Sequence, residues 1–318
     1  MSPVVRRRAY LAFAAISVIW GTTYLAIKLA LETIPPFAMG GLRYVAGGAI
    51  LALLLRARGV RLPPVRDWPP FVVIGLLMLG FGNGGVTYAE QFVPSGLAAV
   101  MIATTPFWMT GVDALVGKGE RLGLRKILGL AIGFSGIIVL VWPDLVASAS
   151  GGTGYGAGII ALQLACIGWA FGSSYAKRLS QTADVLASAA MQMMFGGAWM
   201  LLAATVVGEW PRLHFNAATS ASLLYLILAG SVAGYAAYAY ALKYLPVSTV
   251  SMYAYINPVI AVALGTLLLG EPFHARMLVA AAIIAAGILI VRTRSAPAAG
   301  SEPSEAEART VVPVRRAS

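Results

Sequence analysis

The stretch Pro246–Glu271, PVSTVSMYAYINPVIAVALGTLLLGE, is a long apolar run with a proline, Pro258, in its middle and a charge only at its far end. A similar run, PSGLAAVMIATTPFWMTGVDALVGKGE, occurs earlier at Pro94–Glu120. The two runs place their prolines at a common separation of 152 residues, which pairs Pro106 with Pro258. Helix interiors tolerate proline poorly, so prolines at matching positions of two apolar runs indicate a duplicated chain.

Other short motifs repeat at nearly the same spacing and extend the duplication over most of the chain. The motif WGTTY at Trp20–Tyr24 is followed 151 residues later by FGSSY at Phe171–Tyr175. The remaining matched pairs are Gly47-Gly48 with Gly196-Gly197, Tyr88-Ala89 with Tyr240-Ala241, Gly119-Glu120 with Gly270-Glu271, and Gly136 with Gly287. Each half therefore carries the same features in the same order.

The composition excludes an ordinary soluble domain. The 318 residues are 59% hydrophobic and 11% charged, whereas a soluble domain is roughly a quarter charged. A membrane-spanning helix needs about 20 mainly apolar residues. Ten segments meet this requirement, at 9–31, 37–55, 68–89, 94–116, 124–142, 154–176, 185–207, 219–242, 246–269 and 274–292. We predict an all-α integral membrane protein of ten transmembrane helices, embedded in the lipid bilayer.

The net charge of +11 would suit nucleic acid binding, but the positions of the basic residues indicate membrane topology instead. With a cytoplasmic N-terminus and alternating segments, 19 of the 23 Lys and Arg residues fall on the cytoplasmic side. This bias follows the positive-inside rule. We therefore predict a multi-pass protein of the cell inner membrane with both termini in the cytoplasm and no nucleic-acid partner.

Five segments in each half is an odd number, so the two halves enter the membrane in opposite directions. We predict a basic cytoplasmic N-terminus at 1–8, a first five-helix repeat at 9–142 and a linker at 143–153. A second repeat at 154–292 and a disordered cytoplasmic tail at 293–318 complete the chain. Inverted repeats are typical of secondary transporters, whose substrate site lies near the membrane midplane between the halves.

Three motifs resemble those of the drug/metabolite transporter superfamily, in its EamA-type, ten-helix branch. They are IWGTTYLAIK at 19–28, VPSGLAAVMIATTPFW at 93–108 and INPVIAVALGTLLLGEPF at 256–273. The resemblance covers about residues 9–292 and implies alternating access through a central cavity. It also implies small metabolites as substrates, and bacterial members of this branch are often exporters, including exporters of amino acids.

Mid-helix aromatic residues predict the wall of such a cavity. Trp20, Trp108 and Trp169 lie away from the ends of their segments, whereas tryptophan in membrane proteins usually marks the interface. An apolar or ring-bearing solute would stack on them, although packing against lipid or other helices would also place tryptophan there. The other residues that we expect to line the cavity are Thr23, Asn83, Ser173, Tyr235, Tyr238, Ser251, Tyr253, Tyr255 and Asn257. Pro106 and Pro258 are the predicted hinges, since each frees a backbone carbonyl one turn earlier.

Charged residues inside or beside the spanning segments are expected to have specific roles. Glu90 closes the third segment, at the outer face, where we expect little energetic penalty, and Asp113 lies one turn from the inner end of the fourth. Either carboxyl could carry a coupling proton. We expect Lys28 to reach the interface, and Arg43 to bind backbone carbonyls or a lipid headgroup.

Several motif matches do not predict chemistry. The segment at 80–85 fits the dinucleotide pattern G-x-G-x-x-G but lies inside an apolar span with no preceding strand. GFSG at 133–136 resembles a rhomboid serine motif, but His214 and His274 both belong to loops. No metal-ligand cluster or Walker A motif is present, and the lone Cys166 excludes an internal disulfide. We predict a non-enzyme without metal or cofactor.

The sequence thus predicts a secondary transporter that exports small metabolites, in particular neutral or aromatic amino acids. Sparse charge in the spanning segments disfavours phosphorylated cargo, whose site would place several Lys or Arg residues at the midplane. Two alternatives stay open: a drug or metabolite transporter of the same fold with either direction of transport, and a scramblase or receptor-like membrane protein without solute flux. We expect a monomer or a weak homo-oligomer.

Overall fold

The computed structural model describes residues 2–115, 123–148, 154–178, 184–245, 250 and 253–292. Within these ranges the regular structure is helical throughout, with no strand. In the described parts of the chain, seven helices are long and apolar enough to cross a membrane, and three further apolar helices are shorter. The predicted all-α membrane class is therefore confirmed.

The first half begins with a helix that is longer than predicted. α1 starts at Pro3, where the hydroxyl of Ser2 accepts a hydrogen bond from the Val5 amide at 3.4 Å, so the basic residues that precede residue 9 are helical. The elements of this half are α1 (Pro3–Ala30), α2 (Pro36–Ala57), the 3-10 turn η1 (Val65–Asp67), α3 (Trp68–Ile74), η2 (Gly75–Asn83), α4 (Gly84–Ala89), α5 (Ser95–Ile102), α6 (Thr105–Leu115) and α7 (Leu124–Ser148). α7 runs to Ser148 rather than Trp142 and so enters the predicted linker.

The second half contains the remaining helices. They are α8 (Tyr155–Arg178), α9 (Val185–Val207), the 3-10 turn η3 (Trp210–Arg212), α10 (Ala217–Tyr225), η4 (Leu226–Ala233), α11 (Gly234–Tyr244), α13 (Tyr253–Leu269) and α14 (Ala275–Arg292). Gly208 caps the C-terminus of α9, and its φ of 74° is the left-handed conformation that glycine adopts readily.

Two π-helical segments occupy matching positions in the halves. η2 continues α3 into α4, and η4 continues α10 into α11, so each lies within one long apolar helix. Their first residues, Gly75 and Leu226, are 151 residues apart, the spacing of the repeated sequence motifs. π-Helical turns are uncommon and occur frequently at functional sites. Their matched occurrence is a structural counterpart of the sequence duplication.

The two predicted hinge prolines have different surroundings. The helix breaks at Ala103–Thr104, and Pro106 is the second residue of α6. There the missing proline N–H leaves the Ile102 carbonyl free, and the hydroxyl of Thr105 donates to it at 2.6 Å. Pro258, by contrast, lies inside α13, which continues through it.

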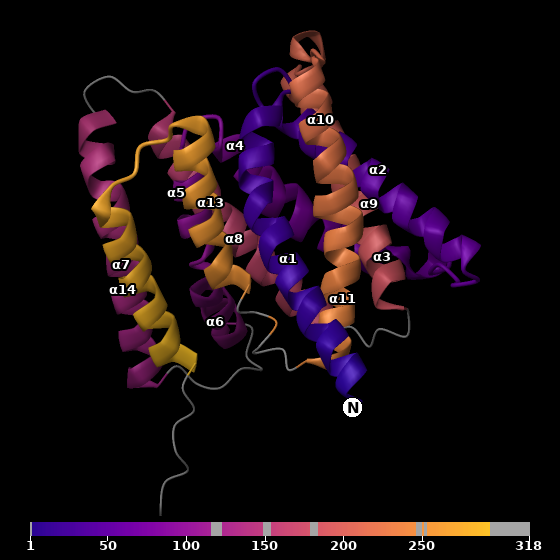
Figure 1. Cartoon of the computed structure of the whole chain (residues 1–318), viewed down its shortest axis with the longest axis horizontal. Helices are drawn as coiled ribbons and strands as arrows, with labels where there is room; N and C mark the ends of the chain where they lie inside the picture. Colours follow the sequence, from indigo (N-terminus) through magenta and orange to yellow (C-terminus); the bar gives the residue numbers. More distant parts are fainter. Residues whose placement is uncertain are drawn as a thin grey trace, which may run out of the picture.

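The helices pair in a pattern that is unchanged when the halves are exchanged. α2 packs on α9, α7 on α14, and α5 on α13. α1 lies between α13 and α11, while α8 packs on α6, α4 and η2 in the corresponding way (Figure 1). The N-terminal end of α1 and the C-terminal end of α14 lie at the same end of the bundle (Figure 1). We call the opposite end, where α1 ends and α2 and α5 begin, the N-distal end.

Candidate functional site

Trp20 in α1 is surrounded by three tyrosines from two other helices. Its ring centroid lies 5.6 Å from that of Tyr235 and 5.3 Å from that of Tyr238, both in α11. Tyr253 in α13 packs edge-on at 4.9 Å. All four side chains are partly buried. The structure thus brings together four of the residues predicted for the cavity wall, and we call them the aromatic cluster.

Hydrogen bonds fix the helices around this cluster. The indole N–H of Trp20 donates to the carbonyl of Gly230 in η4 at 3.0 Å. The amide of Asn257 in α13 is buried, and with its nitrogen directed toward α1 it donates to the carbonyls of Ser17 and Tyr253 at 3.1 and 3.0 Å. Asn257 therefore joins α13 to α1 beside the aromatic cluster, a structural role that the sequence did not indicate.

Trp108 belongs to a different part of the bundle. Its indole N–H donates to Oε1 of Gln163 in α8 at 2.9 Å, and its ring meets Phe134 of α7 edge-on at 5.5 Å. Among the described residues no ring contact joins Trp108 to Trp20. The predicted tryptophans therefore form at least two separate groups of contacts.

The remaining predicted residues are dispersed. Trp169 packs against the buried cluster that also contacts Tyr235. Asn83, at the end of η2, donates to the Met78 carbonyl of its own helix at 3.4 Å, and Thr23 bonds the Trp20 carbonyl. Ser173 is partly buried in α8. Two further predictions cannot be placed: Ser251 lies outside the described residues, and Asp113 is described only as part of α6.

An apolar cavity of about 500 Å³ lies between α5, α13 and α14. Tyr255 and Pro258, a predicted cavity residue and a predicted hinge, line it, and the rest of its wall is nearly all aliphatic, including Val100, Val262 and Ile284. This cavity can hold an apolar group, and Tyr255 and Thr266 are the lining residues that carry a hydroxyl.

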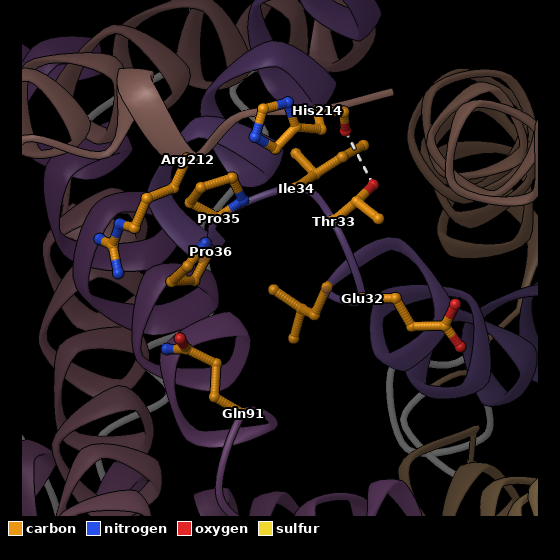
Figure 2. A pocket seen from close by; sticks show the side chains of 9 residues that line it. Glu32, Thr33, Ile34, Pro35, Pro36, Gln91, Arg212 and His214 are labelled. Atoms are coloured by element: carbon orange, nitrogen blue, oxygen red, sulfur yellow. Dashed lines mark hydrogen bonds between the residues drawn. The ribbon is translucent and has the colours of Figure 1, made fainter. Parts of the chain in front are cut away.

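A second cavity, of about 250 Å³, opens at the N-distal end and contains none of the predicted site residues. Segment 31–36 lines it together with Gln91, Arg212 and His214. Figure 2 shows the hydrogen bond from the Thr33 hydroxyl to the His214 carbonyl, at 2.7 Å, which ties the loop after α1 to the loop after α9. The carboxylate of Glu32 points away from the hollow (Figure 2).

Two carboxylates at the N-distal end cap helices of the other half. Glu271 accepts hydrogen bonds from the amides of Ser95 and Gly96, at 2.8 and 3.2 Å, and from the Ser95 hydroxyl at 2.9 Å. Glu209 accepts from the Ala38 amide at 2.7 Å, at the start of α2. A carboxylate at a helix N-terminus is stabilised by the free N–H groups and by the helix dipole.

Two other charged residues near the spans bind polar groups of the protein. The ammonium of Lys28 donates to the carbonyls of Glu90 and Val93, at 2.5 and 3.1 Å, in the turn at the N-distal end, and its reach to the membrane interface stays a prediction. Arg43 is 4% exposed and donates to the hydroxyl of Ser231 in η4 at 3.1 Å, rather than to a carbonyl or a lipid. Side-chain partners of this kind depend on tertiary contacts, so sequence spacing gave no sign of them.

Glu90 is the clearest correction. We expected a carboxylate at the outer face with little penalty, but its side chain is fully buried and neither carboxyl oxygen has a hydrogen-bond partner. Cys166 is a free, buried thiol. No group of three metal-ligating side chains occurs among the described residues.

Comparison with known proteins identifies the family. The sequence pattern of the EamA-like transporter family matches residues 7–142 and again 156–293. The chain is 37% identical to the uncharacterized inner membrane transporter YedA of Escherichia coli K12, over 88% of this chain and 89% of that protein. It is 27% identical to a probable amino-acid metabolite efflux pump of Salmonella typhimurium, over 90% and 94% of the two chains.

A protein of known crystal structure, 20% identical in sequence, has a similar fold. It superposes with a TM-score of 0.63 over 89% of this chain and 97% of that chain. At this identity the likeness concerns the fold alone. With the family pattern matched in both halves and helices long enough to span a bilayer, this chain belongs to the EamA-like transporter family of the drug/metabolite transporter superfamily, and is a multi-pass inner-membrane transporter.

Proposed function

We propose that this transporter exports small metabolites, in particular neutral or aromatic amino acids, by alternating access between two inverted five-helix repeats. The repeats are residues 9–142 and 154–292, with both chain ends in the cytoplasm. Three observations support the repeat: the two family matches, the π segments 151 residues apart, and helix pairing that is symmetric between the halves. The basic residues support the orientation.

The observation that carries the proposed substrate site is the aromatic cluster. It lies where α1 of the first half meets α11 and α13 of the second, which is the interface that moves in alternating access. Inverted-repeat transporters bind substrate between their halves. Partly buried rings with phenolic hydroxyls offer a stacking surface and a few hydrogen bonds, which suits a neutral solute with an apolar or aromatic side chain.

The proposed cargo has further support from charge. A phosphorylated solute would require several cations at the site, whereas Arg43 is the one basic residue in the described central parts of the spans. The name of the Salmonella relative concerns amino-acid metabolites. Among the alternatives, the apolar cavity beside Tyr255 favours an apolar drug-like cargo over a polar metabolite.

The proposal is tested by counterflow in proteoliposomes loaded with a mixed amino-acid pool. Labelled phenylalanine or threonine should enter loaded vesicles and not empty ones, and Trp20→Ala should abolish this uptake. Trp142→Ala, at a residue 64% exposed, serves as the matched tryptophan control and should retain it. Exchange of sugar phosphates in place of amino acids would overturn the proposed cargo, and exchange of an apolar drug alone would favour the alternative.

A further inference from the structure

We propose that Glu90 is a proton-binding site, and that its protonation decides whether Lys28 holds the N-distal end closed. The inference rests on the proposed alternating access only for its consequence in transport, since the proton site itself is defined by the geometry around Glu90. We call Glu90, Lys28 and the turn 90–93 the proton latch.

The first observation is the environment of the Glu90 carboxyl. Glu90 is 0% exposed, and both of its carboxyl oxygens are buried without a hydrogen-bond donor. An ionised carboxylate that has lost its water and gained no donor is strongly disfavoured, whereas a neutral carboxylic acid is tolerated. Glu209 and Glu271, at the same end, instead receive helix N-terminal amides. Of these three acids, Glu90 is the one suited to carry a proton.

The charged and titratable neighbours of Glu90 come from several helices. Lys28 and Tyr24 belong to α1, Arg43 to α2, and Glu271 follows α13. α8, which packs on α4, has no charged side chain between residues 155 and 176. Glu90 follows the apolar span that ends at Ala89.

These neighbours act on Glu90 in opposite directions. Burial raises the pKa of Glu90 well above its ordinary value, the Glu271 carboxylate raises it further, and the Lys28 and Arg43 cations lower it. Because Lys28 and Arg43 favour the ionised carboxylate, Glu90 can release its proton when the bundle changes conformation.

The second observation is the position of Lys28. Its ammonium donates to the carbonyls of Glu90 and Val93, and so ties α1 to the turn that joins α4 to α5. A carboxylate is a stronger acceptor for an ammonium than a carbonyl. Loss of the Glu90 proton therefore draws Lys28 from the carbonyls to the carboxylate, or draws Glu90 toward water, and either change loosens the turn. Protonation events of this type move interfaces between two states.

The presence of a proton on Glu90 is tested by infrared spectroscopy of the protein in lipid bilayers, without any substrate. Infrared difference spectra between low and high pH should show the C=O stretch of one protonated buried carboxyl, absent in Glu90→Gln and present in Glu32→Gln. Glu32 is the matched control, because it is an exposed acid at the same end. An unchanged band in Glu90→Gln would overturn the proton site.

The latch is tested by the distance between spin labels at Gln91 and Arg212, which lie on two segments around the N-distal cavity. Cysteines are introduced at these two positions in a Cys166→Ala chain, and the spin labels are attached to them. The distance should lengthen as pH rises, should stay short at every pH in Glu90→Gln, and should be long at every pH in Lys28→Gln. A pH-dependent distance that persists in Glu90→Gln would overturn the latch.

Transport separates this inference from the proposed function. Wild-type amino-acid counterflow should change with pH in one step, and Glu90→Gln should show the low-pH rate throughout. Counterflow with an unaltered pH profile in Glu90→Gln would remove the latch and leave the transporter standing. Absence of any amino-acid exchange by the wild type would remove the proposed cargo, and the spectroscopic results would still decide the proton site.

Discussion

The indole N–H of Trp20 donates to the backbone carbonyl of Gly230, at 3.0 Å, across 210 residues of sequence. The bond joins α1 of the first half to the π segment η4 of the second, beside three tyrosines. Trp20 therefore belongs both to the aromatic cluster and to the interface between the halves. Gly234 permits this approach, since a Cβ there would lie 2.5 Å from the indole nitrogen of Trp20.

Substitution of Trp20 separates the hydrogen bond from the ring. Trp20→Phe keeps an aromatic surface and loses the bond to Gly230, so we expect a loss of about 1 kcal/mol in unfolding free energy and retained counterflow. Trp20→Ala removes the stacking surface as well, and counterflow should be lost. Thermal unfolding and counterflow measure the two effects. Equal transport by both variants would show that Trp20 is not a substrate contact.

The cap on α5 predicts a stability effect of Glu271. Glu271→Gln keeps an acceptor oxygen for Ser95 and Gly96 but removes the negative charge at the N-terminus of α5, which in a partly buried site costs up to about 2 kcal/mol. Glu32→Gln, at an exposed acid of the same end, should change stability by less than about 0.5 kcal/mol. Thermal unfolding in detergent compares the two variants, and equal melting temperatures would contradict the cap.

Close packing of α7 on α14 depends on glycine at position 287. A Cβ there would lie 2.6 Å from the Gly129 carbonyl and 2.6 Å from the Gly133 amide, so Gly287→Ala must move the helices apart. We expect a destabilisation of about 1–3 kcal/mol. Gly111→Ala in α6 is the control, because its Cβ would enter open space. It should stabilise by up to about 1 kcal/mol, and a control that destabilised equally would indicate a general intolerance of alanine.

The proposed orientation predicts which loops face the periplasm. Cysteine at position 32 should react with an impermeant maleimide in intact cells, and cysteine at position 61 only after permeabilisation. Both native residues are exposed, and Cys166, 1% exposed, contributes little background. Labelling of position 61 in intact cells would reverse the orientation while leaving the fold unaffected.

The Glu90 proton predicts how stability depends on pH. The folded protein binds this proton more tightly than the unfolded chain, because burial raises the pKa of Glu90. The stabilising contribution is therefore complete below the ordinary glutamate pKa and is lost as pH rises toward the raised value. Melting temperatures of the wild type should fall with pH over this interval more steeply than those of Glu90→Gln. Parallel curves would contradict a raised pKa.

Much of the fold could be read from the chain, because a bilayer imposes simple requirements. Apolar runs of sufficient length predicted the apolar helices of the described residues, seven of them long enough to cross a membrane and three shorter, whereas the ten-helix inverted repeat stays a prediction. The local helix type could not be predicted from the sequence, because nothing in the composition of 75–83 or 226–233 distinguishes a π segment from an α-helix. Both prolines lack a backbone N–H, yet the helix breaks before Pro106 and continues through Pro258, so proline by itself did not predict which of the two helices would break.

The sequence predicted which types of residue form the candidate site, but it did not predict which of them lie together. Mid-helix aromatics identified Trp20, Tyr235, Tyr238 and Tyr253 individually, and the fold brought these four together while placing Trp108 against α7 and α8. The sequence by itself determined the membrane class and the positions of the apolar helices, since these depend on local hydrophobicity and on the length of each apolar run. Only the tertiary structure decided that Glu90 is buried without a donor and that Lys28 binds carbonyls, because burial and hydrogen bonding depend on which helices meet.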